Sequence, residues 1–155
     1  MRIRLLAVGT KMPAWAEQGV ETYRKRLPRD FTLEIEEIPL GQRGKNADIA
    51  KARAQEAQRI REKLRGDEIV VALEVKGKPW TTEQLAQEAD GWRMEGRDVV
   101  LLVGGPDGLE PALSAMADKA WSLSPLTLPH PLVRIMLAEQ LYRAWTLLVG
   151  HPYHR

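Results

Sequence analysis

The sequence predicts an α/β protein built on a largely parallel sheet with helices on both faces. Two runs, "EIVVALEV" (68–75) and "DVVLLVGG" (98–105), are nearly continuous in apolar residues, which is typical of strands covered on both faces. Strand-like and helix-like segments alternate along the chain, and this order indicates parallel strands joined by helical connections. A chain of 155 residues fits a single domain, residues 1–155, around one core.

Four apolar, β-branched-rich runs predict strands, and a weaker run predicts a fifth. The strong runs are 3–9, 32–38, 68–75 and 98–105, and the weaker one is 120–124. Ligands of parallel sheets usually bind beyond the carboxyl ends of the strands. We therefore expect a functional site near Val75, Val103 and Ser124.

Helical patterns occupy the intervals between these strands, at 13–26, 47–65, 82–94, 109–117 and 131–149. Asn46 or Asp48 is expected to cap the second helix, because their side chains accept hydrogen bonds from free backbone amides. Thr81 and Gln84 have the spacing of a capping box at the start of the third.

The last predicted helix begins near Pro131 and ends before Gly150, two residue types that favour those positions. Its apolar residues occupy more than one face, so it must be covered on most sides. In so small a protein this pattern predicts a subunit interface in addition to the core, with Tyr142 and Trp145 as candidate anchors.

Composition excludes several classes of protein. The chain has no cysteine, so disulfides, thiolate metal sites and thiol-based covalent catalysis are impossible. The short apolar run at the N-terminus does not have the pattern of a signal peptide, and no other stretch approaches membrane-spanning length. We expect a soluble, cytoplasmic protein with no membrane partner.

Charge is distributed unevenly although the net charge is only +2. Residues 1–65 hold 15 Lys/Arg against 9 Asp/Glu, whereas residues 66–155 hold 8 against 12. Basic clusters suit a polyanion, because each neutralised phosphate releases counterions. Any one cluster is more simply a solvated helix face, but the asymmetry as a whole favours a nucleic-acid partner.

The stretch "VGGPDG" (103–108) lies between a predicted strand and a predicted helix. Glycines in this position let backbone amides approach a ligand closely. The spacing is not G-x-G-x-x-G, and no P-loop sequence occurs anywhere in the chain. A plain turn and a cofactor-binding loop remain equally compatible with this motif.

The three histidines are not spaced as metal ligands, so no metal site is expected. His130, between two prolines, is interpreted as a structural cap of the last helix.

The tail "HPYHR" (151–155) is unusual for a free C-terminus, because it combines imidazoles, a phenol and a guanidinium. Such groups stack on and hydrogen-bond to splayed RNA bases; a terminus docked into a dimer partner is the alternative.

Seven segments together resemble one known family, and the match extends over the whole chain. They are "AVGTKM", "RGKNADI", "GKPW", "LLVGGPDGL", "LTLPHPLVR", "EQLYRAW" and "HPYHR". The sequence is identified on this basis as similar to the bacterial SPOUT-class large-subunit rRNA methyltransferases, which modify N3 of a pseudouridine. The resemblance implies a parallel α/β domain with a C-terminal deep trefoil knot, working as a homodimer. It also implies S-adenosyl-L-methionine as the methyl donor, with no metal.

The same resemblance assigns site residues. The donor pocket maps onto Leu73, Gly104, Gly105, Leu123, Ser124, Pro125, Leu126, Thr127 and Leu128. Prolines around residues 123–131 would hold the main chain in a fixed path for reading adenine, and rigidity reduces the entropy lost on binding.

Catalysis is assigned to the tail and the last helix. His154 is expected to accept or orient the proton, and Arg155 to face the uracil oxygens or a phosphate. Tyr153 is expected to stack on the base, with Arg143 of the last helix in a supporting role. Tail residues of one subunit would complete the pocket of the other. Because the chain has no cysteine, the thiol route of pyrimidine C5 methylation is closed, in agreement with methylation at nitrogen.

The resemblance further implies 23S rRNA as substrate, and we expect the assembled 70S ribosome or its large subunit, because a small dimer gains specificity from a large shaped target. The basic segments 24–29, 43–45 and 51–65 would hold RNA. A non-catalytic ribosome-binding or assembly factor with the same fold is the alternative. An oxidoreductase-type nucleotide domain is disfavoured, because no G-x-G-x-x-G follows the first strand.

Overall fold

The computed structural model describes residues 1–44 and 48–154, except for the side chain of His154, and confirms the α/β prediction. Within these residues five strands form one parallel sheet in the order β2-β1-β4-β3-β5. The strands are β1 (Arg2–Val8), β2 (Thr32–Ile38), β3 (Ile69–Pro79), β4 (Val99–Val103) and β5 (Lys119–Ser122). The helices are α1 (Ala14–Arg24), α2 (Ile49–Lys63), α3 (Thr82–Glu95), α4 (Pro111–Met116) and α5 (His130–Val149), followed by the 3-10 turn η1 (Pro152–His154).

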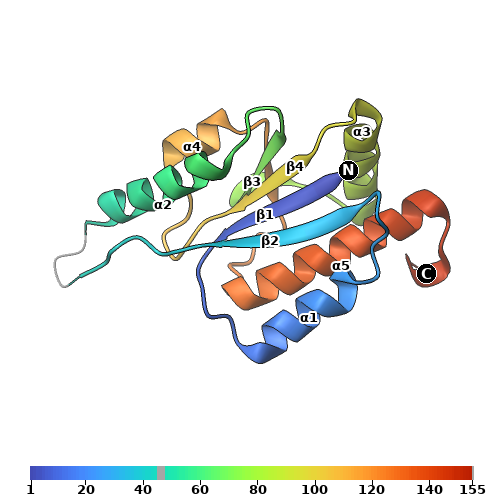
Figure 1. Cartoon of the computed structure of the whole chain (residues 1–155), viewed down its shortest axis with the longest axis horizontal. Helices are drawn as coiled ribbons and strands as arrows, with labels where there is room; N and C mark the ends of the chain where they lie inside the picture. Colours follow the sequence, from blue (N-terminus) through green and yellow to red (C-terminus); the bar gives the residue numbers. More distant parts are fainter. Residues whose placement is uncertain (45–47, 155) are drawn as a thin grey trace.

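Helices cover both faces of the sheet, as the apolar strands require (Figure 1). Because neighbouring side chains of a strand point to opposite faces, Leu5 and Leu6 of β1 enter different halves of the core. The half that contains Leu5 is closed by α1, α3 and α5. The half that contains Leu6 is closed by α2 and α4, through residues such as Ile60 and Leu113.

Helix ends follow the capping chemistry predicted from the sequence. Asp48 caps α2 by accepting a hydrogen bond of 3.1 Å from the backbone N–H of Lys51, whereas the alternative cap, Asn46, lies outside the described residues. Thr81 and Gln84 form both bonds of the capping box on α3. Gly150 ends α5 in the left-handed conformation, with φ of 73°.

Strand β3 continues four residues beyond its predicted end, but not as a regular ladder. Its pairing with β5 jumps between Leu73 and Lys78, so residues 74–77 leave the sheet as a bulge. Gly77 lies so close to β5 that a Cβ atom there would stand 2.8 Å from backbone atoms of Ala120 and Trp121. Residues 74–76 therefore project from the sheet beside the carboxyl ends of the strands.

The C-terminal half of α5 packs against an aromatic cluster of its own chain. Tyr142 is only 6% exposed, with its ring 4.7 Å from the ring centroid of Tyr153 and 6.0 Å from that of Trp145. The interpretation of Tyr142 as an exposed interface anchor is therefore wrong, because the folded monomer already covers this side chain. Trp145 is partly exposed and stays a predicted anchor.

None of the helices in the described residues combines the length and apolarity that a membrane crossing requires. The strand order, with β4 between β1 and β3, is consistent with the predicted C-terminal knot, whose threading stays a prediction.

Candidate functional site

A cavity of about 540 Å³ opens at the carboxyl ends of β3, β4 and β5. Its walls come from residues 74–76 in the bulge of β3, the glycine turn at 104–108, the loop at 123–128, His130 and Val133 in the first turn of α5, and Arg53 of α2. This is the position that a parallel sheet offers to ligands, and it agrees with the expectation drawn from the strand ends.

The structure brings eight of the nine predicted donor-pocket residues to this one cavity. Those that line it are Leu73, Gly104, Gly105, Leu123, Ser124, Leu126, Thr127 and Leu128. Pro125, the ninth, does not line the cavity. It lies within the lining loop and shapes the main chain there, because its ring fixes φ.

Glycine is required in the turn after β4 because main-chain segments touch there. A Cβ atom at Gly104 would stand 2.5 Å from the carbonyl carbon of Gly108 and 2.6 Å from the nitrogen of Leu109. The turn is closed by a hydrogen bond of 3.0 Å from the N–H of Gly108 to the oxygen of Gly105, and Gly108 adopts a positive φ of 79°. The backbone of this turn therefore forms a cavity wall without covering side chains.

The loop after β5 is held by its own serines. The Ser122 hydroxyl donates to the oxygen of Ser124 (3.0 Å), and the Ser124 hydroxyl accepts from the N–H of Leu126 (2.9 Å). Leu126 is nevertheless 69% exposed. An exposed leucine on a fixed loop at a cavity offers apolar surface that a ligand can cover.

His130 is not a helix cap, so that interpretation is wrong. Pro129 occupies the cap position without any side-chain hydrogen bond, and the His130 ring instead reaches the backbone oxygen of Gly104 through Nε2. Because a carbonyl only accepts, Nε2 carries the proton, and the buried Nδ1 has no hydrogen-bond partner among the described residues. Burial, the largest cause, and the charge of Arg134 lower the pKa of His130, although the bond to Gly104 opposes them.

Four polar residues of the cavity wall were missed by the sequence analysis: Arg53, Glu74, Lys76 and Asp107. Glu74 accepts a hydrogen bond from the hydroxyl of Ser114 on α4. Its signal was present, because an acid directly after a continuous apolar strand stands at the edge where ligands bind. Arg53 comes from a different element, α2, and only the tertiary fold brings it here.

The predicted catalytic residues lie at the other end of α5. Arg143 pairs with Glu139 at 2.6 Å, and its guanidinium lies 4.9 Å from the ring centroid of Tyr153. The Tyr153 hydroxyl donates to Glu139 at 3.2 Å. Burial, the largest cause, together with Tyr23 and Glu139 raises the pKa of Tyr153 to about 12. Arg155 and the side chain of His154 lie outside the described part of the chain.

One chain therefore does not bring the two predicted groups of site residues together. α5 begins with His130 at the cavity and ends with Val149, so its 20 residues span roughly 30 Å at 1.5 Å per residue. Figure 1 shows the start of α5 near the loops beyond β4 and the C-terminus at the opposite end of the molecule. The tail, as described to residue 154, packs on its own helix, away from its own cavity.

Comparison with known proteins assigns the chain to a family. The family described as "Predicted SPOUT methyltransferase" matches residues 1–154. The chain belongs to the SPOUT methyltransferase family. Relatives named "Ribosomal RNA large subunit methyltransferase H" cover all 155 residues, at 64% identity in Chromohalobacter salexigens and 62% in Hahella chejuensis. The alignments also cover 100% and 99% of those two relatives.

Solved structures share the fold of this SPOUT chain at low sequence identity. A probable methyltransferase from Bordetella pertussis matches with a TM-score of 0.58 and 16% identity, covering 92% of this chain and 95% of that one. A putative methylase family protein from Neisseria gonorrhoeae matches with a TM-score of 0.55 and 13% identity, covering 91% and 80%. At such identities the likeness supports the SPOUT fold alone.

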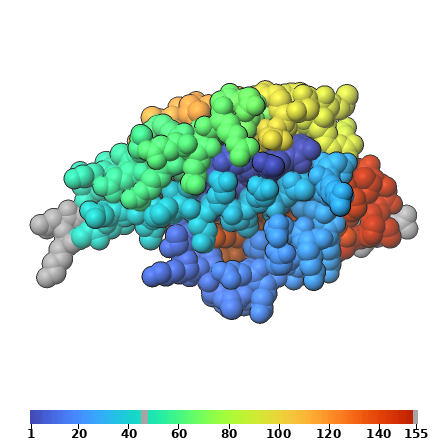
Figure 2. Space-filling model, viewed as in Figure 1, coloured from blue at the N-terminus to red at the C-terminus, as the bar shows by residue number. Residues whose placement is uncertain are grey.

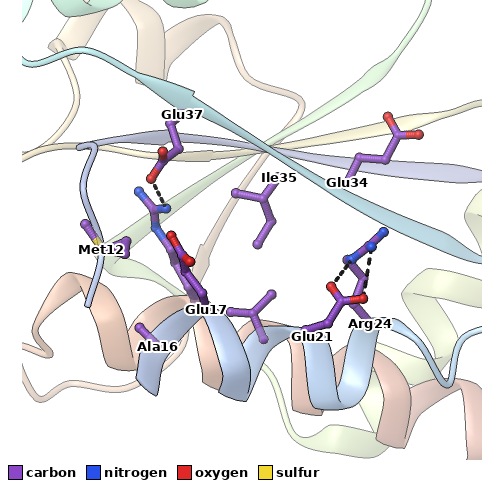
Figure 3. A pocket seen from close by; sticks show the side chains of 10 residues that line it. Met12, Ala16, Glu17, Glu21, Arg24, Glu34, Ile35 and Glu37 are labelled. Atoms are coloured by element: carbon purple, nitrogen blue, oxygen red, sulfur yellow. Dashed lines mark hydrogen bonds and ion pairs between the residues drawn. The ribbon is translucent and has the colours of Figure 1, made fainter. Parts of the chain in front are cut away.

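The SPOUT chain has a second cavity, of about 430 Å³, between α1 and the edge strand β2 (Figure 3). Four carboxylates line it: Glu17, Glu21, Glu34 and Glu37. Three of them already pair with arginines: Glu21 with Arg24 and Glu37 with Arg134, each at 2.7 Å, and Glu34 with Arg2 at 3.6 Å. The cavity at the strand ends is the candidate site, because it lies where parallel sheets bind ligands and contains eight of the nine predicted donor-pocket residues.

Among residues 1–44 and 48–154 of this SPOUT protein, no cluster of three His, Asp or Glu side chains is placed to hold a metal ion.

Proposed function

We propose that this SPOUT methyltransferase transfers a methyl group from S-adenosyl-L-methionine to N3 of a pseudouridine in 23S rRNA, in the cytoplasm. The observation that carries the proposal is the single cavity lined by eight residues assigned beforehand to the donor pocket. Relatives at 64% and 62% identity over the full chain are named as methyltransferases of large-subunit ribosomal RNA, which supports the substrate class.

The cavity fits the methyl donor in size and chemistry. About 540 Å³ lies within the range of small-molecule sites. Leu73, Leu123 and Leu128 offer apolar walls for adenine, and the bare main chain at Gly104 offers hydrogen-bonding groups. The Nε atom of Arg53 is buried without a hydrogen-bond partner in the described residues, so this wall retains a donor for an anionic group.

Chemistry at N3 requires removal of a proton, because this nitrogen lies between two carbonyls and becomes nucleophilic once deprotonated. The bound donor supplies an electrophilic methyl group. We assign to His154 the role of accepting or orienting the N3 proton. Arg155 stabilises the negative charge that develops, and such a group lowers the activation free energy by about 2 to 4 kcal/mol. Holding the acceptor in line with the methyl group provides most of the acceleration.

Tyr153 is suited to stacking rather than to proton abstraction. Its pKa, raised to about 12, keeps the phenol protonated at neutral pH. A protonated phenol stacks on a base and donates a hydrogen bond, but it does not accept the N3 proton. Arg143, held by Glu139 beneath the Tyr153 ring, supports this orientation.

The distance along α5 favours a homodimer in which each tail serves the partner's cavity. Because the cavity and the tail lie at opposite ends of a helix of about 30 Å, the tail of one chain meets its own cavity only by leaving η1 and crossing the molecule. Two chains with antiparallel α5 helices would bring each tail beside the other's cavity. Such a two-fold arrangement is the commonest symmetry of oligomers.

We assign the RNA backbone to basic residues of the segments 24–29, 43–45 and 51–65, whose charges can neutralise phosphates. Arg43 and Arg53 are excepted, because Arg43 is bound by two carboxylates and Arg53 lines the donor cavity, and Lys45 lies outside the described residues. Contacts to phosphates position an RNA but carry no sequence information, so specificity is gained from a large shaped target. We therefore propose the assembled 70S ribosome, rather than free 23S rRNA, as the substrate.

The deciding experiment incubates purified protein and labelled donor with 70S ribosomes, 50S subunits and naked 23S rRNA, each lacking the methylation. Mass spectrometry of the RNA is expected to show one methyl group on one pseudouridine, with the highest rate on 70S particles. Absence of both donor binding and methylation would overturn the proposal and favour a non-catalytic assembly factor. Methylation of naked RNA at an equal rate would overturn the ribosomal substrate only.

A further inference from the structure

We propose that Arg43 is a positioning residue that fixes the turn at 104–108, one wall of the methyl-donor cavity, by clamping it to the segment after β2. The inference rests on the proposed function, because it concerns affinity for the donor. Arg43 itself does not line the cavity. It acts through Asp107, which does.

The clamp consists of one guanidinium and two carboxylates from distant parts of the chain. Arg43 Nε donates to Asp107 Oδ2 at 2.9 Å, and Arg43 Nη1 donates to Glu56 Oε2 at 2.6 Å. Glu56 lies on α2 with its side chain only 3% exposed. The hydrogen bond to Glu56, the largest cause, and that to Asp107 raise the pKa of Arg43, so the guanidinium stays charged.

Backbone contacts leave the clamp little freedom. The N–H of Gly41 donates to the same Glu56 oxygen at 2.9 Å, and Arg43 Nη1 returns a bond of 3.1 Å to the oxygen of Gly41. A Cβ atom at Gly41 would stand 2.2 Å from the carbonyl oxygen of Ala52 on α2, so the main chain touches that helix directly. On the cavity side, a Cβ atom at Gly105 would stand 3.4 Å from Glu56 Oε1.

The position of the turn therefore depends on Arg43. Asp107 lies between Gly105 and Gly108, the residues whose hydrogen bond closes the turn. Without the guanidinium, the buried Glu56 carboxyl group keeps, among the described residues, the hydrogen bond from the Gly41 amide alone, and Asp107 loses its anchor. A planar fork that bridges two carboxylates is specific to arginine, because a lysine ammonium lacks that geometry.

Donor affinity in the absence of RNA tests this role. We expect the Kd for S-adenosyl-L-methionine, measured by calorimetry, to rise about tenfold in Arg43→Gln and in Asp107→Asn, because main-chain groups of the wall lose their fixed position. The double variant is expected to lose no more donor affinity than Arg43→Gln alone, since Arg43→Gln already removes the pairing with Asp107. Arg43→Lys keeps the charge but not the fork, so it should approach Arg43→Gln in donor affinity.

Glu110→Gln is the matched control. Glu110 lies three residues after Asp107 and also pairs with an arginine of the α2 region, Arg61 at 2.7 Å, but it does not line the cavity. Its donor Kd should stay within twofold of the wild type. Kinetics on ribosomes add a second readout: Asp107→Asn should raise the KM for the donor and leave the KM for ribosomes nearly unchanged, a split that general unfolding does not produce.

The outcomes separate this inference from the proposed function. If the wild-type protein binds no donor, the proposed function fails and this inference fails with it. If the wild type binds and both single variants bind equally well with an unchanged melting temperature, only the role of Arg43 is overturned. An equal loss in Glu110→Gln would also overturn it, because the effect would then belong to the whole segment.

Discussion

Gly104, in the cavity wall, leaves no room for one added methyl group. The Cβ atom of an alanine there would overlap main-chain atoms of Gly108 and Leu109, at 2.5 and 2.6 Å. Because backbone cannot rotate away as a side chain does, we expect Gly104→Ala to displace the turn, raise the donor Kd at least tenfold and lower the free energy of unfolding by about 1 to 3 kcal/mol. Calorimetry and thermal unfolding measure the two effects.

Gly91 gives the opposite result and serves as control. It lies exposed within α3, and an added Cβ atom there meets nothing within 4 Å. Alanine removes the entropic cost of glycine in a helix, so Gly91→Ala should stabilise the protein by about 0.5 to 1 kcal/mol. Donor affinity should not change. A loss of donor binding in Gly91→Ala would show that the assay reports on more than the turn.

His130 makes stability depend on pH in a direction set by its lowered pKa. In the unfolded chain the imidazole takes up a proton as the pH falls through about 6.5, whereas the folded protein resists protonation until lower pH. The unfolded state then binds more protons, so the free energy of unfolding is highest above pH 6.5 and decreases as the pH falls towards the folded pKa.

Denaturant titrations at pH 7.5 and 5.5 test this effect in the wild type and in His130→Gln, whose amide can still donate to the Gly104 oxygen. The wild type is expected to lose more stability on acidification than the variant. An equal loss in both proteins would assign the pH dependence to other groups.

Among single residues, the sequence identifies those that belong to a short motif. It misses those whose contacts are with residues distant in the sequence. Gly104 and Leu128 were assigned through motifs that stand in one stretch of sequence. His130 was misinterpreted because its neighbours in sequence are prolines, whereas its partner, Gly104, is 26 residues away. Asp107 and Arg53 carry no local signal, because their meaning depends on α2 packing beside the turn.

Among the elements, β1, β2 and the segment before β3 are joined by a buried charge network. Arg4 of β1 donates to Glu68 at 2.5 Å and to Glu36 of β2 at 2.9 Å. Removing one partner of a buried pair leaves the other charge uncompensated. We expect Glu68→Gln to lower the free energy of unfolding by about 3 kcal/mol, measured by urea denaturation.

The exposed pair of Arg24 and Glu21 on α1 provides the comparison, since its geometry is similar at 2.7 Å but both side chains are about half exposed. Glu21→Gln should change stability by less than about 0.5 kcal/mol, because solvent screens an exposed pair. Similar losses in the two variants would contradict the distinction between buried and exposed pairs.

Element types followed from the sequence more completely than element ends. All five strands and five helices were predicted, since continuous apolar runs and capping residues are strong local signals. The bulge at 74–77 was not predicted, because it depends on the close contact between Gly77 and the backbone of β5. The turn η1 was also missed, since it forms by packing of Tyr153 against the side of α5.

At the scale of the whole molecule, the residues that line the cavity and the residues near the end of α5 lie apart along the long axis. Figure 2 shows the C-terminal part of α5, in red, at one end of the face that carries β2, and the start of α2, in teal, towards the other. A single chain would need its tail to cross this length, whereas two antiparallel copies would not. The placement of the cavity and the end of α5 supports the proposed homodimer.

Mixing two inactive variants distinguishes a pocket completed by the partner from one completed within the chain. Gly104→Ala damages the cavity and keeps the tail, whereas a His154→Ala, Arg155→Ala double variant damages the tail and keeps the cavity. If the tail acts on the partner, each mixed dimer contains one site with both parts intact. If it acts within its own chain, every site carries one damaged part and activity stays at zero.

Random pairing of equal amounts makes half of the dimers mixed, with one working site in two, so co-expressed variants should recover about a quarter of the wild-type rate per chain. Native mass spectrometry must show the mixed dimers, and each variant alone supplies the baseline. Methylation that does not rise above that baseline, in a sample shown to contain mixed dimers, would exclude the shared pocket. A chain that remains monomeric while fully active would do the same, since its tail would then have to reach its own cavity within one molecule.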